Sequence, residues 1–373
     1  MSRSTTVSSH HHDGVAIAWI ISPHGLGHAS RAVAICNALS GIADRNLVHH
    51  VYTTVPETFF AASLDANFVH HSVAVDVGMV QRTPFEEDID ETLAALDRLY
   101  GDGAQTLGIL EQAVGSRCRL VVCDIAPLGL TIAHRLGVPG VLVENFTWDW
   151  IYRYYDNKLL DDYAALLEAH ARSATLRIQT TPICQLAEGA CSVAPVSRRP
   201  RASRFDIRRR LGVPDEHRMV LVSLAGLGEE AIFRPLLRKL AGITLVVPGT
   251  GLGIESHGDV IRIPVVGGPY HPDLMSASDL VVAKLGYSTV AEAYHAGVAF
   301  AYLRRPRFPE SPVLEAFVRE SLPSSPFAPE WLDDADTPKV VEGLLEVPHP
   351  GCARPNGAVD AARLISNLLE ARI

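Results

Sequence analysis

The chain has 373 residues, more than the roughly 250 to 300 at which a single hydrophobic core stops growing, so one small module is excluded and two domains are expected. Hydrophobic residues make up 47%, charged residues 20% and aromatic residues 7%, a balance that excludes a disordered or coiled-coil protein and favours a globular α/β one. The formal net charge of −9 excludes a global positive field for nucleic acid or an anionic membrane, so any anion must be bound locally.

Targeting and redox signals are weak. The six cysteines include no C-x-x-C pair, which favours reduced thiols and a cytoplasmic location. No apolar run approaches the roughly 20 residues that a membrane span needs, so we expect no transmembrane segment, and no pattern supports peripheral membrane contact. Residues 1–13 are polar and include three consecutive histidines, which predicts a disordered leader or tag remnant and no metal site.

From Val15 onward, short apolar runs alternate with segments of helical periodicity, the pattern that builds parallel sheets through helical crossovers. We expect a first Rossmann-like domain over residues 14–185. Its expected strands are 15–22, 47–52, 68–75, 120–123, 138–143 and 174–179, its expected helices are 29–39, 56–64, 88–114 and 127–136, and a short apolar piece follows at 191–194.

Residues 197–210 hold seven arginines in fourteen positions, and this shift in composition predicts an interdomain linker over 186–217. The pattern then restarts, which predicts a second Rossmann-like domain over 218–350 and an amphipathic helix within 351–373 that packs across the domain boundary. The fold class is therefore α/β, with two doubly wound domains facing each other across a cleft. In the second domain, expected strands begin at 219 and cover 243–247, 260–264, 279–284 and 299–303, and expected helices are 229–240, 287–296 and 311–320.

The loop between the first strand and first helix, Ser22 to Arg31, is the first candidate site. It lies at the carboxyl end of a strand, where open α/β sheets bind ligands, and Gly27 permits close approach of an acceptor. His28 at this edge can take a proton from a hydroxyl. The alternative is a histidine that caps or packs the helix.

Asp124 ends a buried strand and is expected to face the same crevice as His28. A carboxylate there can hold the imidazole in one tautomer and stabilise its protonated form. A cap on the following helix explains Asp124 equally well.

The second domain carries the candidate anion site. A strand ending at Lys284 leads to Gly286, and Ser288 and Thr289 open a helix whose free N–H groups suit a diphosphate. Glu292 on this helix can accept hydrogen bonds from a ribose diol, or can be an exposed helix residue. The remaining candidates are Gly226 and Gly228 for the same phosphates and Glu310 for sugar hydroxyls, each with an ordinary turn or helix-start explanation.

Together these segments resemble the GT-B glycosyltransferases, in particular bacterial transferases related to the peptidoglycan GlcNAc transferase and to macrolide and glucuronosyl transferases. The resemblance covers about residues 15–370 and rests on the G-H-A-S-R form of the first loop and the K-x-G-Y-S-T-V-x-E segment. The amino-terminal half of sugar kinases of the L-arabinokinase type looks similar. The resemblance implies His28 as general base, Asp124 as its orienting acid, and a nucleotide-sugar site in the second domain.

The resemblance further implies an inverting displacement that moves a hexose or amino sugar from a nucleoside-diphosphate sugar, most commonly of uridine, to a hydroxyl acceptor. No metal or other cofactor is expected if the helix N-terminus and Lys284 carry the charge of the leaving group. Pro23 and His24 replace glycines of the peptidoglycan enzyme, and Ser311 follows Glu310 where relatives often have Gln. Trp148 and Trp150 lie in an aromatic segment that suits an acceptor wall or ordinary packing.

Two other functions fit the same fold. A nucleotide-sugar epimerase or hydrolase would need carboxylates near the donor sugar, which Asp124 and Glu310 can supply. A non-catalytic nucleotide-sugar-binding protein would not need the pair of His28 and Asp124.

Overall fold

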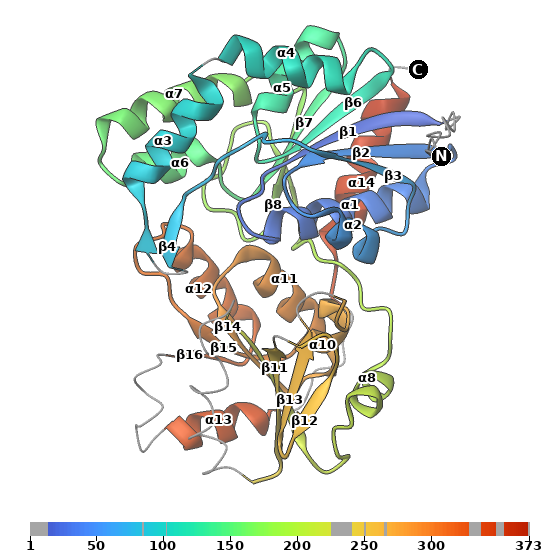
Figure 1. The fold of residues 1–373 in the computed structure, drawn as a ribbon, viewed down its shortest axis with the longest axis vertical. Coiled ribbons are helices and arrows are strands. Elements are labelled where there is room, and N and C mark those ends of the chain that lie inside the picture. Colours follow the sequence, from blue (N-terminus) through green and yellow to red (C-terminus); the bar gives the residue numbers. More distant parts are fainter. Residues whose placement is uncertain are drawn as a thin grey trace, which may run out of the picture.

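The computed structural model describes residues 14–83, 86–101, 103–224, 241–249, 251–264, 267–327, 337–347 and 354–371. Two sheets, one from each half of the chain, lie in two bodies stacked along the long axis of the molecule (Figure 1).

The first sheet has seven parallel strands in the order β3-β2-β1-β6-β7-β8-β9. The chain winds outward in both directions from β1 and β6, so the crevice at their carboxyl ends is the switch point where such sheets bind ligands. The strands are β1 (Val15–Ile21), β2 (Leu47–Thr53), β3 (Phe68–Ser72), β6 (Cys118–Asp124), β7 (Gly140–Glu144), β8 (Leu176–Thr180) and β9 (Cys191–Val193).

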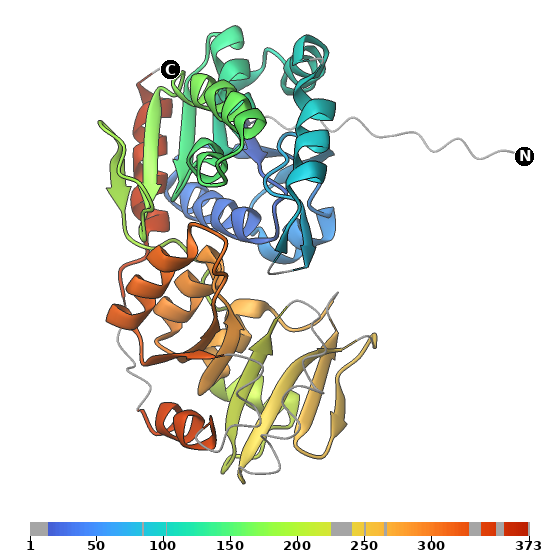
Figure 2. The ribbon, with the colours of Figure 1, turned by 90° about the vertical axis from the view of Figure 1, so that its left-hand side faces the viewer.

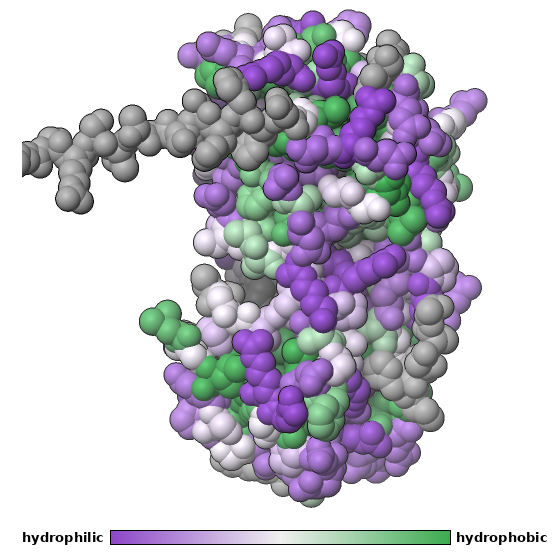
Figure 3. Space-filling view, turned by 90° about the vertical axis from the view of Figure 1, so that its right-hand side faces the viewer, coloured by the Kyte–Doolittle hydropathy of each residue, from purple (hydrophilic) through white to green (hydrophobic). Residues whose placement is uncertain are grey.

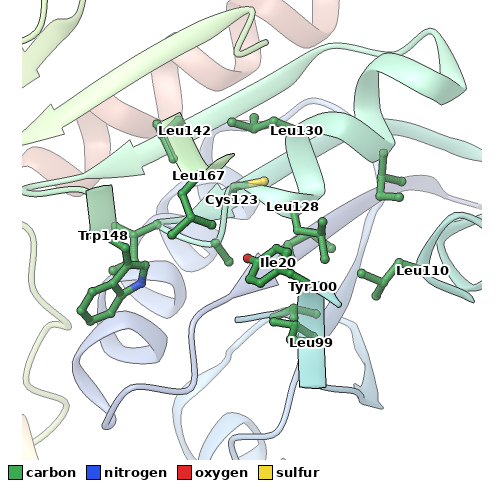
Figure 4. Packing of buried hydrophobic residues seen from close by; sticks show 14 of the residues in the cluster. Ile20, Leu99, Tyr100, Leu110, Cys123, Leu128, Leu130, Leu142, Trp148 and Leu167 are labelled. Carbon is green, nitrogen blue, oxygen red and sulfur yellow. The ribbon is translucent and has the colours of Figure 1, made fainter. Parts of the chain in front are cut away.

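Helices cover both faces of this sheet (Figure 2). Because side chains alternate along a strand, Ala18 and Ile20 of β1 enter one hydrophobic cluster while Ile17 and Trp19 enter the other. Figure 4 shows the first cluster, in which Ile20 lies among side chains from the helices that cover this face of the sheet. The elements around the sheet are α1 (Gly27–Ile42), α2 (Glu57–Ser63), α3 (Ile89–Tyr100), α4 (Gly103–Val114), α5 (Leu128–Leu136), α6 (Trp148–Arg153), α7 (Lys158–Ala171) and the hairpin of β4 (Gln81–Thr83) and β5 (Glu86–Glu87).

The second sheet has the order β12-β13-β11-β10-β14-β15-β16, and its described pairs are parallel except β12 with β13. Its switch point lies between β10 and β14. The strands are β10 (Arg218–Ser223), β11 (Ile243–Gly249), β12 (Glu255–His257), β13 (Val260–Pro264), β14 (Leu280–Lys284), β15 (Ala299–Leu303) and β16 (Ser324–Phe327), and the helices are α8 (Arg204–Leu211), α10 (His271–Ala277), α11 (Tyr287–Ala296), α12 (Ser311–Ser321) and α13 (Thr337–Leu345).

The last helix, α14 (Gly357–Glu370), returns to the first half of the chain (Figures 1 and 2). It lies against α1, and its Ala361 and Ile365 are fully buried in the cluster that contains Trp19. The chain therefore crosses between the two bodies twice.

Several details differ from the sequence-based expectations. The single helix expected over 88–114 is two helices, because the chain turns after Tyr100. The arginine-rich stretch contains helix α8, which begins because the Ser203 hydroxyl accepts a hydrogen bond from the backbone N–H of Asp206. The helix expected over 229–240 lies outside the described residues.

Four of the seven arginines of this stretch pair with carboxylates elsewhere in the protein. Arg198 is buried against Glu292, Arg201 pairs with Asp65, and Arg204 and Arg208 pair with Asp279. The face in Figure 3 is mostly hydrophilic, with hydrophobic side chains in small separate groups. Within the described ranges, no helix combines the length and the apolar character that crossing a bilayer requires.

Candidate active site

The candidate site lies where the carboxyl ends of strands from both sheets meet. In the first half, β1 leads to the loop that contains His28, β6 ends at Asp124, and β7 leads to Asn145. In the second half, β14 leads to the start of α11 and β15 leads to the loop before α12. Parallel strands present this edge to ligands because helix N-termini and free loop groups gather there.

His28 and Asp124, which lie 96 residues apart in the sequence, are in contact. His28 Nδ1 lies 2.9 Å from Asp124 Oδ1, and the two side chains are 10% and 1% exposed. A carboxylate can only accept, so Nδ1 carries the proton and donates it, which leaves Nε2 as the basic nitrogen. The predicted proximity of the two residues is confirmed.

Arg31, one turn after His28 on α1, is a partner that the sequence analysis did not single out. Its Nε donates to Asp124 Oδ2 at 2.8 Å and its Nη2 to Asp124 Oδ1 at 2.6 Å. Its Nη1 donates to Asn145 Oδ1 at 2.8 Å, and Asn145 Nδ2 in turn donates to Glu310 Oε1 at 2.8 Å. One hydrogen-bonded chain therefore joins the histidine of the first half to a carboxyl group of the second.

Burial and charge set the protonation states. Burial lowers the pKa of His28, and the nearby Arg31 cation acts in the same direction, although hydrogen bonding to Asp124 opposes both. Burial raises the pKa of Asp124, but the Arg31 charge and its hydrogen bonds outweigh this and lower it overall. At neutral pH the pair is therefore a neutral imidazole beside a carboxylate, the state a general base needs.

The backbone next to Asp124 is strained. Ile125 has a φ of +45°, a region that a β-branched residue rarely adopts. Hydrogen bonds from Ser22 N to Asp124 O and from Ile125 N to Val143 O hold this turn. Such conformations cost roughly 1–3 kcal/mol and persist where the surroundings enforce them, as they do at many functional sites.

Aromatic side chains pack around His28. Trp148 is 1% exposed, lies 6.3 Å from the His28 ring and 5.0 Å from the His24 ring, and donates its Nε1–H to Asp76. Phe308 of the second half stacks on His24 with centroids 6.2 Å apart. Trp150 is half-buried against the core cluster, and the assignment of Trp148 and Trp150 to an acceptor wall stays a prediction.

The start of α11 faces the first half. Gly286 is its N-cap, and a Cβ atom there would meet nothing within 4 Å. The Ser288 hydroxyl donates to Gly27 O across the two halves at 2.6 Å, so Gly27 and Ser288 contact each other in this structure, and Thr289 is half-buried beside them. The helix still presents the free N–H groups of its first turn, which is where anions bind.

Two cations lie at this edge. Lys284 ends β14, and burial together with Arg305 lowers its pKa. Arg305 is 6% exposed, stacks over Phe308 with its Cζ 3.9 Å from the ring centroid, and bonds Glu87 of the first half at 3.3 Å. The Nε of Arg305 is buried without a hydrogen-bond partner among the described residues. Arg305 could not be singled out from the sequence, because it lies next to Arg304 and close to Arg307 in a basic run.

Glu292 is not an exposed helix residue. Its carboxylate is 4% exposed and bonds Arg198 through Oε1 at 2.9 Å and His271 through Oε2 at 2.7 Å. Its assignment to a ribose diol therefore stays a prediction, and in this structure both of its oxygens already have protein partners. Gly226 and Gly228 lie outside the described residues.

The comparison with protein-family models gives no match. A search of curated proteins finds an L-arabinokinase from Arabidopsis thaliana that is 28% identical over 319 residues, 80% of this chain and 29% of that protein. The chain thus spans less than a third of the length of this relative.

Solved structures share the whole architecture. The spinosyn forosaminyltransferase SpnP matches with a TM-score of 0.60 and 15% identity, covering 96% of this chain and 95% of that one. MurG of Acinetobacter baumannii matches at 0.55 and 17%, covering 94% and 99%. A UDP-glucosyltransferase from Polygonum tinctorium matches at 0.58 and 13%, covering 95% and 98%. The predicted GT-B fold, with two Rossmann-like domains, is confirmed.

Proposed function

We propose that the protein is a glycosyltransferase that moves a sugar from a nucleoside-diphosphate sugar to a hydroxyl group of an acceptor, in the cleft between its two halves. The observation that carries this proposal is the hydrogen-bonded pair of His28 and Asp124, linked through Arg31 and Asn145 to Glu310 of the opposite half. The solved structures of the same fold include several glycosyltransferases, which supports this activity.

The reaction begins with the acceptor hydroxyl beside His28. Nε2 takes the hydroxyl proton while the oxygen forms a bond to the anomeric carbon of the donor. The bond from that carbon to the phosphate oxygen breaks from the opposite side, and its electron pair leaves with the nucleoside diphosphate. The product therefore has the inverted configuration. Asp124 accepts a hydrogen bond from the Nδ1–H of His28 throughout, the proton stays on Nδ1, and the ring is kept in the productive tautomer.

The leaving group needs positive charge. The first turn of α11, which follows the N-cap Gly286, supplies free N–H donors. Lys284 and Arg305 supply side-chain cations at the same edge of the second sheet. These groups suit a diphosphate without a divalent cation, and uridine diphosphate is the nucleotide that we expect. Glu310 is the expected acceptor of hydrogen bonds from the donor sugar.

Hydrolysis of the donor is the second function that the site supports, because His28 can deprotonate water as it would a hydroxyl. Release of free sugar at the same rate with and without added hydroxyl compounds would favour the hydrolase. A rate that rises with a particular acceptor would favour the transferase.

A thermal-shift screen against UDP-, TDP- and GDP-sugars and the free nucleotides tests the donor site. A ligand at one hundred times its dissociation constant stabilises the native state by about 2.7 kcal/mol, a shift of a few degrees. We expect one nucleotide class to raise the melting temperature of the wild type and of Lys158→Met, a control at an exposed lysine on α7, but to raise that of Lys284→Met less. Absence of a shift with every nucleotide would refute the donor assignment.

A further inference from the structure

The Arg31 side chain occupies an unusual position for a cation. It is 1% exposed, and its guanidinium makes hydrogen bonds to Asp124, Asn145 and Thr180. The ring of Tyr287, from α11 of the second half, lies over it at 4.9 Å. Arg31 therefore contacts both halves of the protein at the centre of the cleft.

Two of its nitrogens hold the Asp124 carboxylate. Nε and Nη2 bond the two different oxygens of Asp124, an arrangement that fixes the plane of the carboxylate as a single ammonium could not. Asp124 Oδ1 is shared between Arg31 and His28, so the orientation of the imidazole depends on where Arg31 holds this oxygen.

The third nitrogen determines which way the Asn145 amide faces. A guanidinium has no acceptor, so the group that bonds Nη1 must be the amide oxygen of Asn145. Its NH₂ group then points across the cleft, where it donates to Glu310 Oε1 at 2.8 Å. The bond to Asn145 uses only Oε1, so the other oxygen of Glu310, Oε2, can accept a hydrogen bond from a sugar hydroxyl.

We propose that Arg31 is a positioning residue that aligns both sides of the reaction at once: it orients His28 through Asp124, and it orients Glu310 through Asn145. This inference rests on the proposed function for its consequence in catalysis. With the halves docked, one rigid guanidinium sets the geometry between the base and the carboxyl group assigned to the donor sugar.

The variants Arg31→Met, Arg31→Lys and Asn145→Ala separate the two arms. The first removes both arms, the second keeps the charge without the planar fork, and the third removes only the link to Glu310. Arg204→Met is the matched control, because Arg204 also pairs with a buried carboxylate, that of Asp279, but outside the cleft.

The first readout is the pKa of His28, measured by NMR of the imidazole and assigned by the signal that disappears in His28→Gln. The charged or titratable groups that face His28 are Asp124 from β6, Arg31 from α1 and His24 from the preceding loop. In Arg31→Met we expect the pKa of His28 to rise by about one to three units, because Asp124 is left to stabilise the imidazolium alone. In Asn145→Ala and Arg204→Met we expect it to stay at the wild-type value.

The second readout is donor turnover. Asn145→Ala should raise the KM for the donor or lower kcat while the pKa of His28 is unchanged. Arg31→Lys keeps the charge but lacks the planar fork, and it should still lower kcat. The NMR titration needs no turnover, so it tests the Asp124 arm even if the proposed function fails.

Variants that lose thermal stability yet keep the wild-type pKa of His28 and the wild-type kinetics would overturn the proposal, because that result describes a purely structural arginine. If Arg31→Met does not fold, Arg31→Lys and Asn145→Ala decide the matter by the same two readouts.

Discussion

We predict that His24 makes the first half of the protein less stable in mild acid. Burial lowers its pKa to about 3, with added repulsion from Arg305 and Lys284. In the unfolded chain the same histidine titrates near its ordinary value of about 6.5. As the pH falls below about 6.5 the unfolded state takes up a proton that the native state refuses, so the free energy of unfolding decreases.

The size of this effect follows from the two pKa values. Between pH 7 and pH 5 the unfolded state gains about 2 kcal/mol from protonating one such histidine, while a native pKa of about 3 leaves the folded state almost unprotonated. Asp76, whose pKa burial raises to about 6, acts in the opposite direction over part of this range. The contribution of His24 must therefore be isolated by comparing variants.

The contribution of His24 to the pH dependence of the free energy of unfolding can be measured by urea unfolding at pH 7 and pH 5, followed by tryptophan fluorescence. Three of the four tryptophans, Trp19, Trp148 and Trp150, lie in the first half, so most of the signal reports the body that contains His24. We expect the loss of stability between the two pH values to be about 2 kcal/mol smaller in His24→Phe, which keeps a ring beside Trp148. Equal losses in the wild type and the variant would show that His24 is protonated in the folded protein at pH 5, and would refute the reasoning.

Three further predictions concern packing and charge. Gly129→Ala should destabilise the protein by roughly 1–3 kcal/mol in urea unfolding, because a Cβ atom there would lie 2.5 Å from Ile20 Cγ1, and a wild-type midpoint would contradict it. Arg198→Met leaves Glu292 without its guanidinium partner, and we expect the free energy of unfolding to fall by about 3–5 kcal/mol in the same assay. A fall below about 1 kcal/mol would mean that His271 alone satisfies the carboxylate. Lys284→Met should lower kcat without lowering the melting temperature, since burial and Arg305 disfavour the charge of Lys284 in the native state, and an unchanged kcat would remove it from the proposed site.

The periodicity of the sequence was sufficient to predict the two parallel sheets, because strands buried on both faces are nearly continuous apolar runs. The carboxyl-edge rule then placed His28 and Asp124 together, although 96 residues separate them. These inferences succeeded because they depend on strand direction and order, which local patterns encode.

The rest of the site depends on contacts that local patterns do not encode. Asn145 is an ordinary loop residue until Arg31 and Glu310 lie on either side of it. Glu292 has the signature of an exposed residue in a helix, and only the return of the arginine-rich segment buries it against Arg198. Arg31 did carry a signal, since it lies three residues after His28 and therefore on the same face of α1.

The most direct test of the account is the release of nucleoside diphosphate from the donor that the thermal screen identifies, measured for the wild type and for His28→Gln with an acceptor present. We expect the variant to bind the donor as tightly as the wild type, to retain the native fold, and to lose turnover by at least about 100-fold, the typical contribution of a general base. A variant that turns over the donor at the wild-type rate would contradict it, because the hydroxyl proton would then have another acceptor.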